Sequence, residues 1–354
     1  MDCLFAFSLN PAQVLLYIYN MKKHHFFIFL LAVLSSLTAW SQSGSSTATG
    51  RHKTVYPAHS YSFRMVPLGV KGGSDESNLS AYMVAPKGSN NFICFDAGTL
   101  HAGIEKAITA GIFKTSPSDV LRRYIKGYFI SHAHTDHAAG LIINAPDDTA
   151  KNIYGLPFCL DILKDKYFNW KSWANFADEG DKPTLNKYHY APLIEGKEVV
   201  IENTSMYVKA FTLSHSNPYQ STAFLLRSDS NYILYLGDTG ADEIEKSKRL
   251  SKLWQNIAPL VKAKKLKGLF IEVSFPNEQP ASQLFGHLTP QLLMKEMNNL
   301  SMYAGRNAMN DLKVLITHIK PGGNNELNIK KQLMSSNLLQ LRLIFPKQAE
   351  VIRL

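Results

Sequence analysis

Three histidines and an aspartate fall within six residues of this chain, directly after a short apolar run. Residues 127–131 read as a strand, and they lead into the sequence HAHTDH at positions 132–137. Neutral imidazole and carboxylate are common protein ligands of zinc and similar divalent ions. His132 and His134 are two residues apart, so on an extended segment they face the same side. This setting predicts a metal site and disfavours the alternative, a surface cluster of histidines.

One loop cannot complete two metal sites, so further ligands are expected where later strands end. Asp136 and His137 come where the chain turns into a predicted helix, and they can face a second ion beside the first. His215, Asp238 and His318 each follow a separate apolar run. A single strand-end histidine is a weak indication, but these residues occur together and in this order after the first motif. The pattern therefore predicts a two-metal centre, with a carboxylate able to bridge the ions.

Alternating strand and helix patterns predict the architecture. Strands are predicted at 79–85, 92–95, 127–131, 198–202, 206–213, 222–227, 232–236, 269–273 and 314–317. Helices are predicted at 104–113, 138–143, 157–173, 242–262 and 290–302, the last opened by Thr289 and Pro290. Two strand-rich halves with helices between them fit a four-layer α/β sandwich. No linker interrupts residues 56–354, so they are predicted to form one domain.

The segments around the predicted ligands resemble one known family. The stretch from His132 to Pro146 is similar to the signature of the class II cyclic-nucleotide phosphodiesterases, a His-x-His-Leu-Asp-His run followed by Gly, two aliphatics and a nearby Pro. Segments 96–99 (DAGT), 285–289 (FGHLT) and 317–321 (THIKP) also look like that family. Thr135 departs from the signature, which has Leu there, but this is not a ligand position.

The resemblance extends over nearly all of the chain beyond about residue 60. It implies the metallo-β-lactamase fold, a four-layer αββα sandwich of the α/β (α+β) class. It also implies metal-dependent hydrolysis of 3′,5′-cyclic nucleotides, cyclic AMP and also cyclic GMP, to nucleoside 5′-monophosphates. Two alternatives stay open: another hydrolase of this fold, either a phosphodiesterase or nuclease or a β-lactamase, and a non-catalytic periplasmic binding protein.

Ligand assignments follow from the resemblance. The family pattern implies one metal bound by His132, His134 and His215, a second bound by Asp136, His137 and His318, and Asp238 bridging the two. Zinc is the expected ion, with Mn²⁺ or Fe²⁺ as alternatives. His287 is the main rival of His318 as a ligand, but its Gly-His-Leu-Thr context resembles a family position near the substrate phosphate.

Two adjacent cations lower the pKa of a shared water toward about 7 and withdraw charge from a phosphoryl oxygen. Asp136 can also orient the attacking hydroxide. The leaving 3′-oxygen needs a proton, and His287 is the candidate donor. Glu272 ends a predicted strand, where it could hydrogen-bond His287 or a ligand imidazole. The alternative for Glu272 is an ordinary carboxylate at a strand end.

The amino-terminal region has the layout of a secretory signal peptide. A basic start at Met21 precedes the apolar run Phe26–Leu34, and Ala39 and Ser41 are small residues placed for cleavage near Ser41. Residues 1–20 are then upstream of the true start codon, 21–41 are the signal, and 42–55 are a flexible leader. Export to a periplasm without stable membrane association is expected; a membrane anchor is the alternative.

The formal net charge of +10 favours anionic substrates or surfaces. Basic residues are spread along the chain apart from the run at 262–267, which reads as the solvated end of a helix. Basic residues interleaved with aromatics are not evident, so no nucleic-acid partner is expected. The expected partner is a small cyclic nucleotide, and the oligomeric state stays open, a dimer included.

A few remaining residues have two readings. Cys94 and Cys159 could pair, but the apolar strand around Cys94 favours buried free thiols. Trp170, Trp173 and Phe176 could line a nucleobase, although aromatics at such spacing more often belong to the core. Four histidines without an evident partner are set aside. They are His52, His59, His101 and His189.

Overall fold

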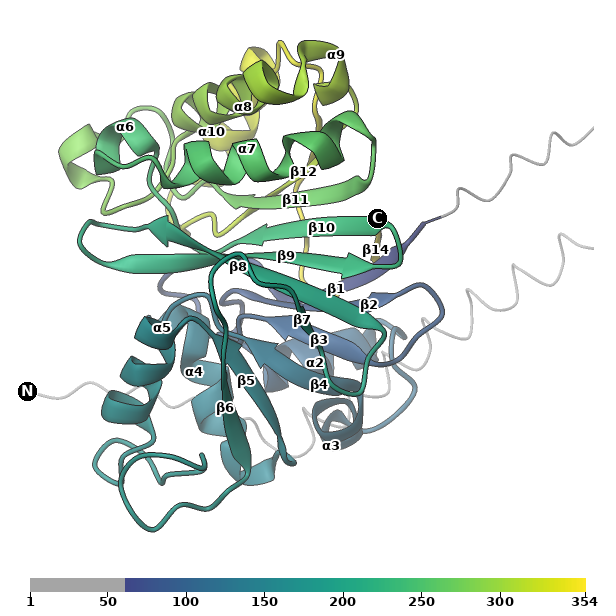
Figure 1. Ribbon diagram of the computed structural model, residues 1–354, viewed down its shortest axis with the longest axis vertical. Coiled ribbons are helices and arrows are strands. Elements are labelled where there is room, and N and C mark those ends of the chain that lie inside the picture. Colours follow the sequence, from purple (N-terminus) through teal and green to yellow (C-terminus); the bar gives the residue numbers. More distant parts are fainter. Residues whose placement is uncertain (1–60) are drawn as a thin grey trace, which may run out of the picture. The chain divides into compact units, whose positions relative to one another are not determined.

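Two seven-stranded sheets lie face to face, and helices cover both outer faces (Figure 1). The computed structural model describes residues 61–354, which fall within the unit His59–Leu354. The predicted four-layer arrangement is confirmed. The predicted signal peptide and leader lie outside the described residues.

The first sheet is built from the first half of the chain and its last strand. Its order is β14-β1-β2-β3-β4-β5-β6. Strands β3, β4, β5 and β6 are mutually parallel along this order, while β1 and β2 pair antiparallel. The strands are β1 Phe63–Gly69, β2 Ala81–Pro86, β3 Phe92–Phe95, β4 Ile125–Phe129, β5 Lys151–Gly155, β6 Tyr188–Pro192 and β14 Ile352–Arg353.

The second sheet is built from the second half, in the order β13-β12-β11-β10-β9-β8-β7. Strands β10, β11 and β12 are parallel, whereas β8, β9 and β10 form an antiparallel meander. The strands are β7 Val199–Val200, β8 Met206–Ser214, β9 Gln220–Ser228, β10 Asn231–Leu236, β11 Leu266–Glu272, β12 Lys313–Thr317 and β13 Arg342–Ile344.

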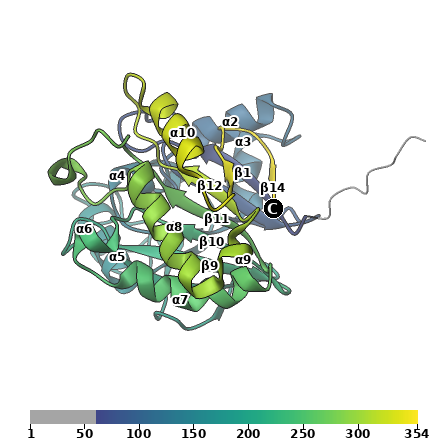
Figure 2. The ribbon, with the colours of Figure 1, turned by 90° about the horizontal axis from the view of Figure 1, so that it is seen from above.

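Helices form the two outer layers, and Figure 2 shows α7, α8 and α10 over the second sheet. Those of the first half are α2 His101–Thr109, α3 Pro117–Asp119, α4 Thr135–Asn144 and α5 Pro157–Ile162. Those of the second half are α6 Asp242–Glu245, α7 Arg249–Lys262, α8 Pro290–Ala304, α9 Arg306–Met309 and α10 Asn325–Ser336. Among the described residues, none of these helices combines the length and apolarity that a membrane span requires.

Three hydrophobic cores fill the spaces between the four layers. The central core, between the sheets, is rich in aromatic rings. Phe95 of β3 stacks on Tyr235 of β10 with ring centroids 4.8 Å apart, and Phe129 of β4 stacks on Tyr154 at 4.5 Å. Because β3 is buried on both faces, its four residues are all apolar, which explains why the sequence predicted this strand with both ends correct.

Two predicted helices are wrong in extent. The helix predicted over 157–173 ends at Ile162 and continues only as a π-helical turn to Tyr167. Beyond it Asn169 accepts hydrogen bonds from the backbone N–H groups of Lys171 and Ser172, and Trp170 is left-handed (φ 62°). Local side-chain bonding of this kind competes with helix continuation.

The helix predicted over 242–262 is two helices, α6 and α7. Lys246 is left-handed (φ 51°) and ends α6, and the Asp242 carboxylate accepts the N–H groups of Leu250 and Ser251 in the first turn of α7. The helix predicted at 104–113 begins earlier, at His101, and the strand predicted at 127–131 is shifted to 125–129. The predicted start of α8 is confirmed, because the Thr289 hydroxyl accepts the N–H of Leu292.

Candidate metal centre

The seven residues predicted as metal ligands all follow the carboxyl ends of strands. Parallel strands bring their carboxyl ends to one edge of a sheet, where α/β proteins commonly bind ligands. The loop after β4 carries His132 and His134, and the first turn of α4 carries Asp136 and His137. The ends of β8, β10 and β12 in the facing sheet supply His215, Asp238 and His318.

One carboxylate oxygen lies at the centre of this group. Oδ2 of Asp238 is 3.2 to 3.9 Å from ring nitrogens of five different imidazoles, and the Asp238 side chain is buried. The five are His132, His137, His215, His287 and His318. A carboxylate so placed can contact ions on either side of it.

Within residues 61–354, five groups of three side chains could hold a metal ion, and two of these groups have the membership that the family resemblance implies. His132, His134 and His215 form one set, here called the first position, and Asp136, His137 and His318 form the second position. Asp238 joins His132 and His137 in a further set that links the two. Within each set the candidate ligand atoms lie within 4.8 Å of one another, a spacing suited to a shared cation.

The imidazoles of the first position have uncharged outer partners. Nδ1 of His132 is 3.0 Å from the Ser131 hydroxyl, and Nδ1 of His215 donates to the Gly286 carbonyl at 2.9 Å. His134 is exposed and stacks on the Tyr219 ring, with centroids 4.6 Å apart. This position is therefore held by hydroxyl, carbonyl and ring contacts.

The second position has a charged outer partner. Nδ1 of His137 is 2.8 Å from Oδ2 of Asp96, and Nδ1 of His318 is 2.9 Å from the Ser274 hydroxyl. Oδ2 of Asp136 accepts the backbone N–H of Gly73 at 2.9 Å. An outer hydrogen bond on Nδ1 directs Nε2 inward and fixes the ring, which is the usual arrangement around a bound metal.

The structure offers a direct test of whether a cation fits. Nε2 of His137 is buried and makes no hydrogen bond within the described part of the chain, although it lies 3.3 Å from Oδ2 of Asp238. Buried polar atoms are nearly always satisfied, so an imidazole nitrogen without a hydrogen bond beside a carboxylate calls for a partner that contacts both groups. A divalent cation supplies that partner, and the donor set of imidazoles and carboxylates suits zinc.

Burial and mutual charge set the protonation of the cluster. Burial lowers the pKa of His134 to about 4 and lowers the pKa of His132 and His215 as well. Neutral imidazole is the form that coordinates metal, so the first position is ready to bind. Although burial acts against it, the carboxylates of Asp238 and Asp96 hold the pKa of His137 above its usual value. A cation at the second position therefore competes with a proton.

His287 and Glu272 form a buried pair beside the cluster. Nδ1 of His287 is 2.7 Å from Oε1 of Glu272, whose other oxygen accepts the Ser274 hydroxyl at 2.7 Å. Glu272 is thus not an isolated strand-end carboxylate. Although burial favours the neutral ring, Glu272 holds the pKa of His287 above its usual value.

The two rival histidines differ in what they face. Nε2 of His318 lies 3.1 Å from Asp136 and 3.2 Å from Asp238, so it faces the second position. Nδ1 of His287 is engaged by Glu272 and lies 3.7 Å from Asp238. His287 also belongs to two candidate groups, one with His215 and Asp238 and one with Glu272 and His318. Because Glu272 already engages Nδ1 of His287, the geometry favours His318 as the ligand of the second position.

Four residues around the cluster have left-handed backbone, a conformation that is costly for bulky side chains. They are Asp96 (φ 50°), Ser216 (φ 53°), Phe285 (φ 51°) and His318 (φ 55°). His318 belongs to the cluster, Asp96 contacts His137, Ser216 follows His215, and Phe285 precedes His287 by two residues. Other left-handed residues lie elsewhere in the described chain, but at a functional site such strain is held in place by the surrounding packing.

Several residues of the centre were missed from the sequence. Buried Asp96 receives the Ser131 N–H and hydroxyl and the Tyr235 phenol, besides facing His137. A carboxylate directly after the wholly apolar β3 was a usable signal for it. Ser274 and Gly73 carried no comparable signal, because their partners are distant in sequence.

The structure decides between the alternative interpretations of the tryptophans, Phe176 and the cysteines. Trp170 and Trp173 are 45% and 39% exposed, so the core interpretation is wrong for both, whereas Phe176 packs against the core of the first sheet. Cys94 and Cys159 are buried free thiols, which excludes the alternative that they pair.

Of the four histidines without a predicted partner, the structure describes two, and both lie away from the metal cluster. His101 lies 3.3 Å from Glu105 on the surface of α2, and His189 contacts Asp178, also away from the cluster. His52 and His59 lie outside the described residues.

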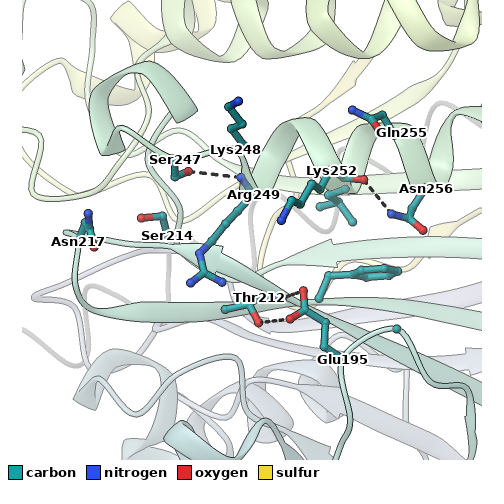
Figure 3. Close-up of a pocket in the computed structure, with 13 residues that line it drawn as sticks. Glu195, Thr212, Ser214, Asn217, Ser247, Lys248, Arg249, Lys252, Gln255 and Asn256 are labelled. Carbon is teal, nitrogen blue, oxygen red and sulfur yellow. Dashed lines mark hydrogen bonds between the residues drawn. The ribbon is translucent and has the colours of Figure 1, made fainter.

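A separate cavity of about 650 Å³ lies between β8, the loop before β7 and the start of α7 (Figure 3). Thr212 donates its N–H and its hydroxyl to the Glu195 carboxylate on one wall, and Arg249 and Lys252 of α7 extend from the other. Ser214 borders the cavity and directly precedes His215, but no residue of the metal cluster lines it.

Comparison with known proteins identifies relatives over most of the chain. A model of the family described as class-II cAMP phosphodiesterases matches residues 63–346. A protein of Aliivibrio fischeri named 3′,5′-cyclic-nucleotide phosphodiesterase is 44% identical over 313 residues, which are 84% of this chain and 94% of that protein.

Solved structures agree on the fold. Unliganded yeast PDE1 superposes with a TM-score of 0.75 at 22% identity, covering 83% of this chain and all of that one. The metallo-β-lactamase fold protein YhfI of Bacillus subtilis gives a TM-score of 0.54 at 16% identity, covering 82% and 99%. The four-layer sandwich is the metallo-β-lactamase fold, as predicted from the sequence.

Proposed function

The chain belongs to the class-II cAMP phosphodiesterase family, and from that premise we propose that it hydrolyses 3′,5′-cyclic nucleotides to nucleoside 5′-monophosphates with two divalent metal ions. The observation that carries this proposal is the completeness of the largely buried cluster around Asp238, with candidate ligands for both positions. Cyclic AMP is the expected substrate, and cyclic GMP is proposed as a second.

The residues proposed to hold the ions are the two sets already described, with Asp238 shared between them. Ions bound there would supply Lewis acidity, which brings the pKa of water toward about 7 and offsets the charge that develops on the phosphoryl oxygens. Zinc is proposed because imidazoles predominate in both sets, and Mn²⁺ or Fe²⁺ are the alternatives. Asp136, which accepts a hydrogen bond from the Gly73 N–H, is proposed to orient the attacking oxygen.

His287 is proposed to protonate the leaving 3′-oxygen. Glu272 accepts a hydrogen bond from Nδ1 of His287, and this leaves Nε2 as the atom available to the substrate. Hydrolysis forms a bond between the water oxygen and phosphorus and breaks the bond from phosphorus to O3′, which must gain a proton. A buried imidazole with a fixed orientation can deliver that proton without reorganising.

A substrate panel tests the proposal. Metal-loaded protein is incubated with cyclic AMP, cyclic GMP, a bis-aryl phosphate and a cephalosporin, and the products are identified by chromatography. We expect 5′-AMP from cyclic AMP, and no cleavage of the cephalosporin. Protein that leaves both cyclic nucleotides intact but opens the lactam or another ester would be a different hydrolase of this fold. Protein that binds a cyclic nucleotide without turnover would be a binding protein.

We also propose that the protein is exported to a periplasm, after removal of residues up to about Ser41. Support comes from the basic start at Met21, the apolar run Phe26–Leu34 and the small residues Ala39 and Ser41. Fractionation followed by amino-terminal sequencing tests this. Full-length chain in the cytosol, with residues 1–20 attached, would contradict it.

A further inference from the structure

Lys320 lies beside the metal cluster but is absent from the roles assigned so far. It follows His318 by two residues, and its backbone N–H donates to the Ser274 carbonyl at 3.2 Å. Two of its neighbours contact residues of the site. The backbone N–H of Gly73 donates to the Asp136 carboxylate, and the Phe275 ring packs edge-on against the His287 ring with centroids 5.8 Å apart.

The ammonium group of Lys320 lies among these neighbours. Its Nζ is 5.9 Å from the centre of the Phe275 ring. A Cβ atom placed on Gly73 would be 3.7 Å from the same Nζ, so the ammonium lies above the loop that fixes Asp136. Its charge also reaches His287, where it acts against protonation of the imidazole. Three independent neighbours thus place a positive charge at the margin of the cluster.

This charge has no anionic partner in the described part of the chain. No carboxylate there forms an ion pair with Lys320, and its Nζ makes no hydrogen bond to the residues described. Lys71 provides a contrast. It lies next to Ile319 through a backbone bridge, yet its own ammonium is paired with Glu326. Two neighbouring lysines therefore differ in whether their charge is already compensated.

We propose that Lys320 binds the phosphate of the substrate and of the 5′-nucleotide product, on the side of the cluster formed by Gly73 and Phe275. The proposal rests on the function proposed above, since it specifies how the same site takes up the phosphate. Lys320 is a half-buried residue beside the cluster, and its ammonium has no counter-ion among the described residues, so it would gain a charge-assisted hydrogen bond when a phosphate binds there.

The reaction makes such a charge useful at the end of turnover. A cyclic phosphodiester carries one negative charge, and opening the ring yields a monoester whose second ionisation has a pKa of about 6. The phosphate therefore becomes more negative along the reaction coordinate. A fixed cation at its edge stabilises the transition state and product more than the ground state, so it raises kcat/KM as well as product affinity.

Equilibrium binding to the metal-loaded protein tests this proposal separately from turnover. The ligands are 5′-AMP and adenosine, which differ by the phosphate, and the variants are Lys320→Gln, Lys320→Arg and the control Lys71→Gln. We expect Lys320→Gln to weaken 5′-AMP binding about 10–100-fold, the value of one charge-assisted hydrogen bond, while adenosine binding changes less than about twofold. Lys320→Arg should recover most of the affinity, and Lys71→Gln should leave it unchanged.

Each other outcome has a distinct meaning. If Lys320→Gln binds 5′-AMP as tightly as wild type, or weakens adenosine equally, Lys320 does not bind phosphate. Loss of metal from Lys320→Gln would instead show a structural role and would also overturn the proposal. Wild-type protein that is inert toward cyclic nucleotides, yet loses 5′-AMP affinity on Lys320→Gln, would refute the proposed function while keeping the phosphate contact.

Discussion

The two metal positions share Asp238 but are held differently. In the first position, the outer partners of the imidazoles are the Ser131 hydroxyl and the Gly286 carbonyl, and His134 is exposed. In the second, His137 is backed by the buried Asp96 carboxylate, and a carboxylate is itself a candidate ligand. The second position therefore has more negative charge and less exposure to water. We infer that it binds its ion more tightly, while the first exchanges more readily.

Replacing Asp238, the ligand that both positions share, should prevent ion binding at both of them. Asp238→Ala deletes the carboxylate between them, so both ions should be lost. Activity should fall by about 10³-fold or more, because the ions contribute several kcal/mol to transition-state stabilisation. Elemental analysis and turnover of cyclic AMP check this together. Asp178→Ala is the matched control, since Asp178 also contacts a histidine but lies outside the cluster. Retention of one tightly bound ion in Asp238→Ala would contradict a shared ligand.

Replacing His287 should affect chemistry without affecting either position. His287→Ala should slow turnover about 10²–10⁴-fold, as expected for loss of a general acid. Both ions should remain, because His318 rather than His287 faces Asp136. Metal content and kcat are measured on the same preparation. If His287→Ala loses an ion while His318→Ala keeps both, His287 is a metal ligand and His318 is not.

Replacing the Asp96 carboxylate should lower the ion affinity of the second position more than that of the first. Asp96→Asn should weaken ion affinity about 10–100-fold, mainly at the second position, since outer partners of ligating histidines typically contribute this much. A smaller effect at the first position is expected through Ser131, which bonds to both Asp96 and His132. Competition with a chromophoric chelator gives the two affinities. Tyr235→Phe removes one donor to Asp96 and should have a weaker effect. Equal loss at both positions would contradict the inferred asymmetry.

The smallest expected effect concerns exchange in the unmodified protein. A chelator should remove the two ions in two phases, with the first-position ion leaving first because His134 is exposed. Release is followed by stopped-flow absorbance, and ion content is measured after the fast phase. His134→Ala should abolish that phase, since its position would no longer fill. Single-phase release in wild type would mean that the positions are equivalent.

Local apolar patterns predicted many of the strands and helices, because the residues of these elements alone indicate the secondary structure that they form. Strand β3 is apolar throughout and is bounded by polar residues, so its ends were predicted correctly. Strands β5 and β6 were not predicted. Both contain buried residues, but their short sequences also contain polar residues such as Asn152 and His189. The break between α6 and α7 depends on Asp242 capping a helix eight residues away.

The same distinction applies to the candidate site. The seven candidate ligands could be proposed from the sequence because their residue types and their order along the chain mark them, and the structure brings them together. Their supporting groups could not be proposed, because the contacts join distant segments: Tyr235 reaches Asp96 across 139 residues, and Gly73 reaches Asp136 across 63. Lys320 lies in a segment that resembles the family, but only the structure shows that its charge has no anionic partner among residues 61–354, whereas the charge of Lys71 is paired with Glu326.

The most direct test of the two-position account is anomalous X-ray diffraction from a crystal of the metal-loaded protein. The account predicts two peaks on either side of Asp238, one bounded by His132, His134 and His215 and the other by Asp136, His137 and His318. The peak at the first position should weaken preferentially after a brief chelator soak. A single peak, or one ligated by His287 in place of His318, would contradict it.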